Sequence, residues 1–222
     1  MTEIELQNHY RELLDYCCGN GLKFFETGDP NDLTEWLTGV LPSSVFGDFG
    51  ETKAVLYDDE LPYVIKIPLM RHANSKNYCD IELSNYSAAE EIPEIAGCFA
   101  WMDFLFEYHG FPIYIMEKVD CDEEEVSSRA YDSSFKWACS QEGFIEGSKE
   151  YEEFSEEFED RYYDWSMEAR MESFLEDEWT YQIFKIFQDF CWEHGINDLH
   201  AGNFGFRDGF LVVIDYSGYY GG

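Results

Sequence analysis

Residues 198–203 read DLHAGN, and residues 211–218 read LVVIDYSG. The first stretch sets Asp198 five positions before Asn203 in a short polar loop, and the second sets Asp215 at the end of an apolar run typical of a strand. Phosphoryl transfer needs a carboxylate near the attacking hydroxyl and oxygen ligands for magnesium. We therefore expect the loop to supply a base and one metal ligand, and the strand end to supply a second metal ligand.

Both stretches resemble the catalytic loop and the metal-binding aspartate of the protein-kinase-like superfamily. The DLHxGN form is most similar to aminoglycoside phosphotransferases and to short kinase-like proteins of bacteria and bacteriophages. The resemblance implies that Asp198 is the catalytic base, that Asn203 and Asp215 bind magnesium, and that His200 lies near the γ-phosphate of ATP. There are departures: residues 196–197 (IN) replace the His-Arg pair that often precedes the base, and the metal-binding segment is one residue longer than the usual triplet.

A lysine lies inside an apolar, β-branched run further upstream, in YVIKIP at 63–68. A cation in such a strand needs a partner or a function, because burying an unpaired charge is costly. The kinase resemblance implies that Lys66 holds the α- and β-phosphates of ATP and pairs with a glutamate on the next helix. Glu82 is our first choice for this partner, and Glu90 or Glu91 is the second.

Two shorter segments fit the same resemblance. GDFG at 47–50 falls between two expected strands and resembles a degenerate glycine-rich loop, in which Gly47 and Gly50 would cover the phosphates. MEKV at 116–119 follows an expected strand and resembles the hinge of a kinase, where the backbone around Glu117 would bind adenine.

The remaining pattern predicts an α+β fold. One helix is expected at 2–18 with Thr2 as its cap, and another from Asp29-Pro30 through Leu33, Trp36, Leu37 and Leu41 to Pro42. A partly helical stretch at 78–96 and strands at 44–57, 63–68, 98–106 and 112–118 follow.

The resemblance implies a protein-kinase-like bilobal fold with a small antiparallel β lobe and a truncated helical second lobe, because the sequence ends four residues after Gly218. We expect a helical N-terminal extension at 1–43, a kinase-like N-lobe at 44–119, and an acidic segment with a truncated C-lobe at 120–222.

The charge balance is extreme, with 47 acidic and 14 basic residues and a formal net charge of −33. Residues 120–181 carry about half of it, with 21 acidic and 5 basic residues. Aromatic and small residues recur there at three- to four-residue spacing, which predicts an amphipathic acidic helix: Phe154, Phe158, Tyr162, Trp165 and Ala169. A further helix is expected from Glu176 to His194, ended by Gly195.

Such a surface repels nucleic-acid phosphates and anionic membranes, so we expect no direct binding to either and a basic protein as partner or substrate. The seven cysteines show no CxxC pattern, which favours reduced thiols and argues against zinc. The acidic N-terminus is unlike a signal peptide, and no apolar run could span a membrane. We expect a cytoplasmic protein, in the host cytoplasm if a bacteriophage encodes it.

Three functions remain open from the sequence. The first is magnesium-dependent transfer of phosphate from ATP to a protein. The second is a catalytically silent, kinase-like binding protein whose acidic surface mimics DNA or inhibits a basic host protein. The third is transfer of phosphate to a small molecule, which the DLHxGN form suggests.

Overall fold

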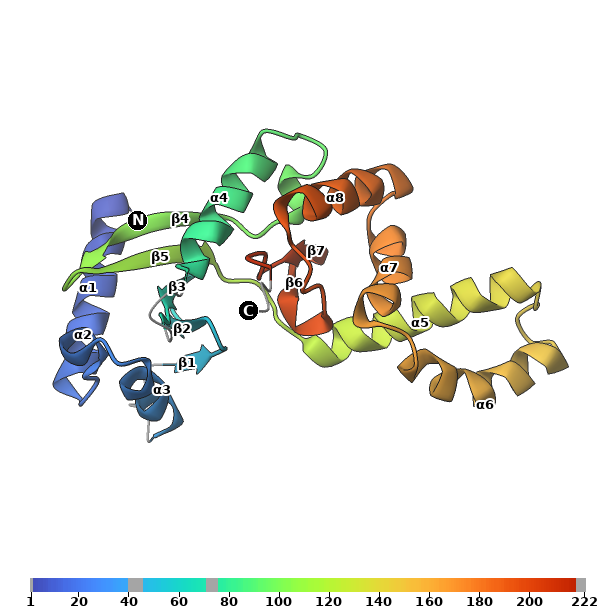
Figure 1. The fold of residues 1–222 in the computed structure, drawn as a ribbon, viewed down its shortest axis with the longest axis horizontal. Coiled ribbons are helices and arrows are strands. Elements are labelled where there is room, and N and C mark those ends of the chain that lie inside the picture. The colour runs from blue at the N-terminus through green and yellow to red at the C-terminus, as the bar shows by residue number, and fades with distance from the viewer. Residues whose placement is uncertain (1, 40–45, 71–75, 219–222) are drawn as a thin grey trace. The chain divides into compact units, whose positions relative to one another are not determined.

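A computed structural model describes residues 2–39, 46–70 and 76–218. The chain divides into two compact units, and Figure 1 labels their helices and strands. Unit 1 comprises residues 1–87 and 100–118, and unit 2 comprises residues 88–99 and 119–222. The expected α+β class is confirmed, since helices and antiparallel strands both contribute.

Unit 1 is built on a five-stranded antiparallel sheet of order β1-β2-β3-β5-β4. Its strands are β1 (Phe46–Phe49), β2 (Lys53–Tyr57), β3 (Tyr63–Pro68), β4 (Met102–Tyr108) and β5 (Phe111–Glu117). β3 has the bounds that its apolar run predicts. His109, at φ 51°, and Gly110, at φ 86°, form the tight turn between β4 and β5.

Three helices pack on one face of this sheet, namely α1 (Glu3–Gly19), α2 (Phe24–Thr27) and α3 (Pro30–Thr38). Thr2 caps α1 in a capping box with Glu5, and Asp29 caps α3 ahead of Pro30, as the sequence predicts. Helix α3 ends at Thr38 with Gly39 as its extended cap, earlier than the expected end near Leu41 and Pro42. Leu41, Pro42 and the expected strand start at 44–45 lie outside the described residues. The helices and sheet share one apolar core, which includes Tyr10, Leu14, Leu33, Leu56, Ile65 and Ile115.

Helix α4 (Tyr78–Glu90) packs on the opposite face of the sheet. The register sets Lys66 across from Val55 on one side and from Tyr114 on the other, so these residues point to the same face. The Tyr114 hydroxyl contacts α4 by donating to Asp80. The side chain of Asn77, just before the helix, donates to the same hydroxyl at 2.7 Å. This face therefore carries the polar groups, while the other face carries the apolar core.

Unit 2 is mainly helical. Its helices are α5 (Glu123–Glu142), α6 (Lys149–Tyr163), α7 (Met167–Glu178) and α8 (Tyr181–His194), with the 3₁₀ turns η1 (Ala96–Cys98) and η2 (Ala201–Asn203). The strands β6 (Phe204–Arg207) and β7 (Phe210–Val213) form an antiparallel hairpin. Phe99 joins η1 to this hairpin by a parallel bridge to Val213, and its ring contacts Phe187, Phe190 and Tyr216.

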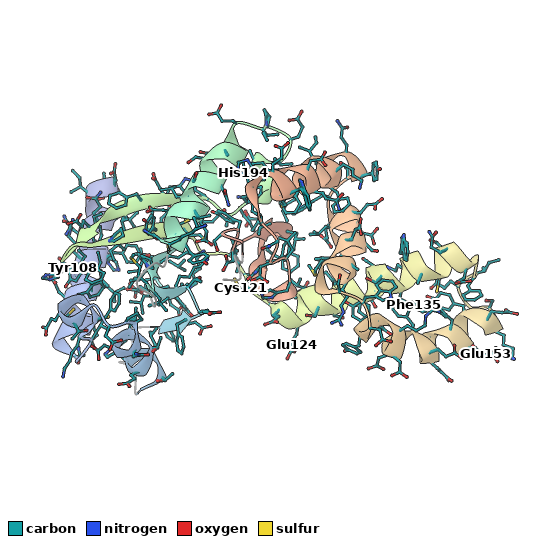
Figure 2. The ribbon with its side chains drawn as sticks, viewed as in Figure 1. Tyr108, Cys121, Glu124, Phe135, Glu153 and His194 are labelled. Carbon is teal, nitrogen blue, oxygen red and sulfur yellow. The ribbon has the colours of Figure 1, made fainter. Side chains whose placement is uncertain are left out.

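A second, smaller core lies between α5 and α6 (Figure 2). The ring of Phe135 contacts Tyr151, Phe154 and Phe158, with centroids 5.1–5.9 Å apart. The glutamates between these rings in sequence, such as Glu153, are exposed. The aromatic face of the acidic segment is therefore buried and its acidic face is exposed, as the periodicity predicts.

Two helix boundaries differ from the sequence prediction. The aromatic repeat at 154–169 is not one helix, because α6 ends at Tyr163 and the Ser166 hydroxyl caps a new helix by accepting from Ala169 N at 3.2 Å. The stretch 176–194 is also broken. Trp179 is extended and buried, and its indole Nε1 donates to Leu211 O at 3.1 Å, while Thr180 caps α8.

None of the helices in the described ranges is long and apolar enough to cross a membrane.

Candidate functional site

The polar face of the unit 1 sheet holds a buried ion cluster. Lys66 Nζ lies 3.1 Å from both carboxylate oxygens of Glu82, and Lys53 Nζ lies 2.8 Å from Oε1. The exposed fractions of Lys53, Lys66 and Glu82 are 5%, 4% and 0%. The predicted pairing of Lys66 with a helix glutamate is therefore present, and the partner is Glu82 rather than Glu90 or Glu91.

Local structure explains how the cluster forms. Lys53 begins β2 two positions before Val55, so it points to the same face as Lys66 across the β2–β3 pair. Glu82 lies in the second turn of α4, the helix that covers this face. Removing these charges from water is costly, and the short ammonium–carboxylate contacts offset that cost.

The glycines at 47–50 are placed differently from the prediction. Most of GDFG belongs to strand β1, and the turn to β2 lies at residues 50–52, where Gly50 N donates to Lys53 O at 2.9 Å. A Cβ at Gly47 would lie 2.5 Å from Leu37 Cδ2 and 2.7 Å from Leu56 Cδ2. The absence of a side chain at Gly47 therefore lets β1 pack against α3 and β2.

Glu117 ends β5 and contacts Trp101 in two ways. Its N–H donates to Trp101 O at 3.0 Å, and its carboxylate accepts from Trp101 N at 2.7 Å. The Glu117 N–H that a hinge would offer to adenine is thus engaged within unit 1.

The DLHAGN loop of unit 2 is closed by its own side chains. Asn203 Nδ2 donates to Asp198 O at 2.5 Å, and His200 Nδ1 accepts from Gly202 N at 3.2 Å. Because Nδ1 accepts a hydrogen bond, the proton of the neutral ring lies on Nε2, which is 3.9 Å from Asp198 Oδ1. The loop therefore presents a carboxylate and an imidazole near each other, and the side chain of Asn203, which closes the loop, is buried.

The β6–β7 hairpin brings Asp215 next to this loop. Phe204 pairs with Val213, and one step beyond this pair Ile214 N donates to Asn203 O at 2.9 Å. Asp215 follows Ile214 directly, so the base of the hairpin places it beside Asn203. These contacts gather Asp198, His200, Asn203 and Asp215 at one end of the hairpin.

A tight turn holds the Asp215 side chain. Its Oδ1 accepts from the hydroxyl of Ser217 at 3.0 Å and from Ser217 N at 3.4 Å. The next residue, Gly218, has φ +70°, and a Cβ there would lie 2.1 Å from Gly195 O. Gly195 is itself the left-handed residue that ends α8. Two glycines therefore let the turn approach the end of α8 closely.

The side chains of Asn203 and Asp215, at the end of the β6–β7 hairpin, carry oxygen atoms of the kind that magnesium prefers as ligands. The amide nitrogen of Asn203 is engaged with Asp198, which leaves its Oδ1 as the acceptor available to a cation. The carboxylate of Asp215 is the second candidate ligand. No group of three or more His, Cys, Asp or Glu side chains suited to a metal occurs among the described residues, and the proposed pair contains only one such residue.

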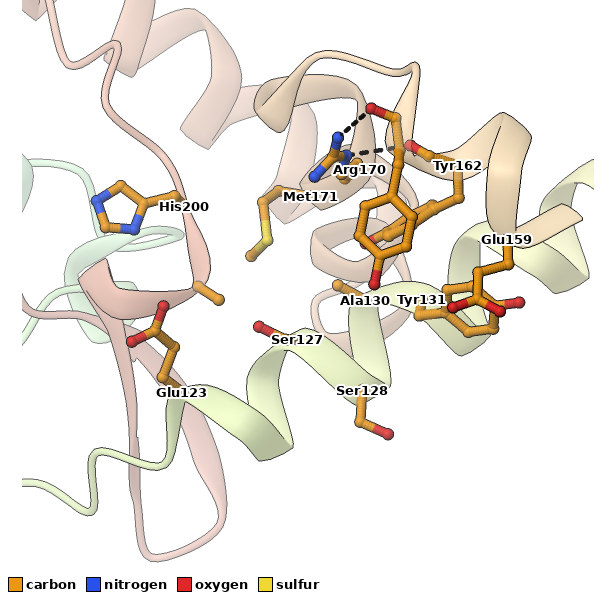
Figure 3. A pocket seen from close by; sticks show the side chains of 12 residues that line it. Glu123, Ser127, Ser128, Ala130, Tyr131, Glu159, Tyr162, Arg170, Met171 and His200 are labelled. Carbon is orange, nitrogen blue, oxygen red and sulfur yellow. Dashed lines mark hydrogen bonds between the residues drawn. The ribbon is translucent and has the colours of Figure 1, made fainter.

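A cavity of about 640 Å³ adjoins the loop (Figure 3). It is lined by Glu123, Ser127, Ser128, Ala130 and Tyr131 of α5, Glu159, Tyr162 and Tyr163 of α6, Arg170 and Met171 of α7, and His200 and Ala201. A Cβ at Gly202 would lie 3.1 Å from His200 Cε1 and 3.5 Å from Glu123 Cδ, so the imidazole and the Glu123 carboxyl flank the same glycine.

Sequence reasoning missed Lys53 and the residues of α5. The alternation in KAVLY could have indicated that Lys53 shares a face with Val55. The spacing of Glu123, Ser127 and Tyr131, four residues apart each time, could have indicated one face of a helix. In both cases the contact partner lies far away in the sequence.

No family model, curated protein or solved structure matches this chain.

Proposed function

We propose that the chain is an ATP- and magnesium-dependent phosphotransferase of protein-kinase-like fold that acts on a protein substrate. The arrangement that carries the proposal is the end of the β6–β7 hairpin, where the Asn203–Asp198 hydrogen bond and the Asn203–Ile214 backbone bond gather the residues of the motif.

The roles follow from the chemistry of each group. Asp198 accepts the proton of the acceptor hydroxyl as its oxygen attacks the γ-phosphorus. The bond between that phosphorus and the oxygen bridging to ADP breaks, and ADP leaves with the bonding electrons. The Nε2–H of His200 faces the Asp198 side and can donate to a phosphate oxygen. Magnesium held by Asn203 and Asp215 would neutralise charge on the phosphates.

Lys66 supplies positive charge for the α- and β-phosphates in this proposal. Glu82 fixes the ammonium group, since both carboxylate oxygens lie 3.1 Å from Nζ. Burial limits the ammonium to few positions, and preorganised charge of this kind is effective in binding phosphates. Lys53, which shares Glu82, is a second cation on the same sheet face.

The test compares the wild type with Asp198→Asn, Asp215→Asn and the matched control Asp208→Asn. Asp208 lies in the exposed β6–β7 turn and undergoes the same chemical change in the same hairpin. Transfer of labelled phosphate from ATP to a mixture of basic and acidic proteins is measured in the presence of magnesium. ATP affinity is measured by calorimetry with and without magnesium.

We expect Asp198→Asn to lower the transfer rate about 100-fold or more while ATP affinity is kept, because only the general base is removed. Asp215→Asn should also abolish the magnesium-dependent part of ATP affinity, and Asp208→Asn should change neither. Equal transfer by wild type and Asp198→Asn would contradict the proposal.

The second candidate is an acidic binding protein that uses the same scaffold without catalysis. The observation that favours it is the row of exposed carboxylates on α6, opposite the buried rings of Phe154, Phe158 and Tyr162. If the wild type binds ATP and basic proteins but transfers no phosphate, this candidate replaces the first.

A further inference from the structure

The cavity beside the DLHAGN loop has charges at both of its ends. Glu123 flanks Gly202 at the end near His200, and Glu159 lies near Tyr131 at the other end (Figure 3). Burial raises the pKa of Tyr131, and the Glu159 carboxylate raises it further, which fits this proximity. Both glutamates are exposed, and neither has an ion-pair partner within the described parts of the chain.

The one full cation of the lining is already engaged. Arg170 donates from Nε to Tyr162 O at 3.1 Å and from Nη2 to Tyr163 O at 2.5 Å, and its guanidinium stacks on both tyrosine rings. These bonds tie Arg170 to the junction of α6 and α7. The two glutamates therefore give the cavity walls an excess of negative charge.

The length of the cavity can be taken from α5. Glu123 and Tyr131 are separated by eight residues of helix, which corresponds to about 12 Å at about 1.5 Å per residue. An extended chain covers that distance with three or four residues, at about 3.3–3.6 Å each. Tyr131 and Tyr163 add aromatic surface on which an arginine or lysine side chain can pack.

We propose that this cavity binds an extended basic polypeptide segment, with a serine or threonine hydroxyl at the His200 end, one basic residue beside Glu123, and a second basic residue three or four positions away beside Glu159. That this hydroxyl accepts the phosphoryl group of ATP rests on the proposed function. The binding of the basic segment does not depend on it.

Peptide binding to the full chain tests this assignment. The probe is a nine-residue peptide with one serine, an adjacent arginine and a second arginine four positions from the first. The comparison peptides carry glutamate in place of both arginines, or both arginines side by side. Spermidine serves as a small organic cation without peptide backbone. Affinities are measured by calorimetry in about 0.15 M salt, where the Debye length is about 8 Å.

The variant is Glu123→Gln with Glu159→Gln, and the matched control is Glu152→Gln with Glu156→Gln. The control removes the same number of exposed carboxylates from α6 but none that line the cavity. Thermal unfolding of both variants checks that the fold is kept.

We expect the cavity variant to bind the spaced-arginine peptide about 5- to 20-fold more weakly, since exposed ion pairs each contribute a few-fold at most, and the control to change affinity less than about twofold. Equal weakening by the two variants, or equal binding of the glutamate peptide, would overturn the assignment. If spermidine binds as tightly as the peptide, the cavity is a site for a small cation, and the assignment of a polypeptide is wrong. Phosphate transfer is measured separately, so that peptide binding without transfer would reject the proposed function and leave this inference standing.

Discussion

In unit 1 the ammonium groups of Lys53 and Lys66 meet the Glu82 carboxylate, and these side chains are at most 6% exposed, whereas in unit 2 the side chains of His200 and Asp198 are 37% and 42% exposed. The first group is held by ion pairs inside a sheet–helix layer. In the second, His200 Nδ1 accepts from Gly202 N, and the Asn203 side chain donates to the backbone carbonyl of Asp198.

This difference predicts different costs of substitution in the two units. A buried charge that loses its partner destabilises the fold strongly, because the remaining charge cannot be solvated. A half-exposed carboxylate can change without that cost, because water replaces its contacts. Substitutions in the unit 1 cluster should therefore lower the free energy of unfolding, while substitutions of Asp198 should alter activity without that loss.

The largest effect is expected from Glu82→Ala. The substitution leaves the ammonium groups of Lys53 and Lys66 buried without the carboxylate that they share, and the free energy of unfolding should fall by about 3–5 kcal/mol. Urea denaturation at neutral pH measures the loss. Asp59→Asn, which breaks the exposed pair with Lys118, should cost less than about 1 kcal/mol. Similar losses for the two variants would show that the Glu82 cluster is open to water.

A smaller effect is expected from Gly218→Ala in unit 2. At φ +70° an alanine costs about 1–2 kcal/mol, and its Cβ would overlap Gly195 O, so the total should reach about 2–4 kcal/mol. Gly209→Ala is the control, because its φ is +81° but a Cβ there would meet nothing within 4 Å. It should cost only the backbone strain. If both alanines cost the same, close packing at Gly218 does not hold the Asp215 turn.

The sequence predicted those parts of the fold that depend on neighbouring residues. The Thr2 cap, the Asp29-Pro30 start, the β-branched run of β3 and the glycine after α8 are local signals, and the structure has each of them. The loop and hairpin around Asn203 were predicted for the same reason, because only a few residues separate the motif's members.

The parts that were missed depend on partners far away in the sequence. Gly47 looked like a loop glycine, but Leu37 of α3 explains it. Sequence reasoning did not single out Lys53, which the β2–β3 register and Glu82 bury. Trp179 fitted a helical pattern, but it is extended in the structure, where its indole N–H donates to Leu211 O. Periodicity alone could not reveal these contacts.

The smallest effect on stability is expected from substitutions of the exposed glutamates of α6. Replacing Glu152, Glu153, Glu156 and Glu157 by Gln removes four exposed carboxylates and one surface ion pair, Lys149–Glu153. The free energy of unfolding should change by less than about 0.5 kcal/mol, because such pairs contribute little.

If α6 steers association electrostatically, the four-Gln variant should associate with a basic protein probe more slowly than the wild type at low salt. The attraction of exposed carboxylates extends over about one Debye length, which is longest at low salt. Stopped-flow rates measured from low salt up to about 1 M, where the Debye length is about 3 Å, should converge for wild type and variant. ATP affinity should be the same for both, because these glutamates are not among the residues assigned to the nucleotide. A rate difference that persists at high salt would point to direct contacts rather than steering. Equal rates at low salt would show that the acidic face of α6 only keeps the protein in solution.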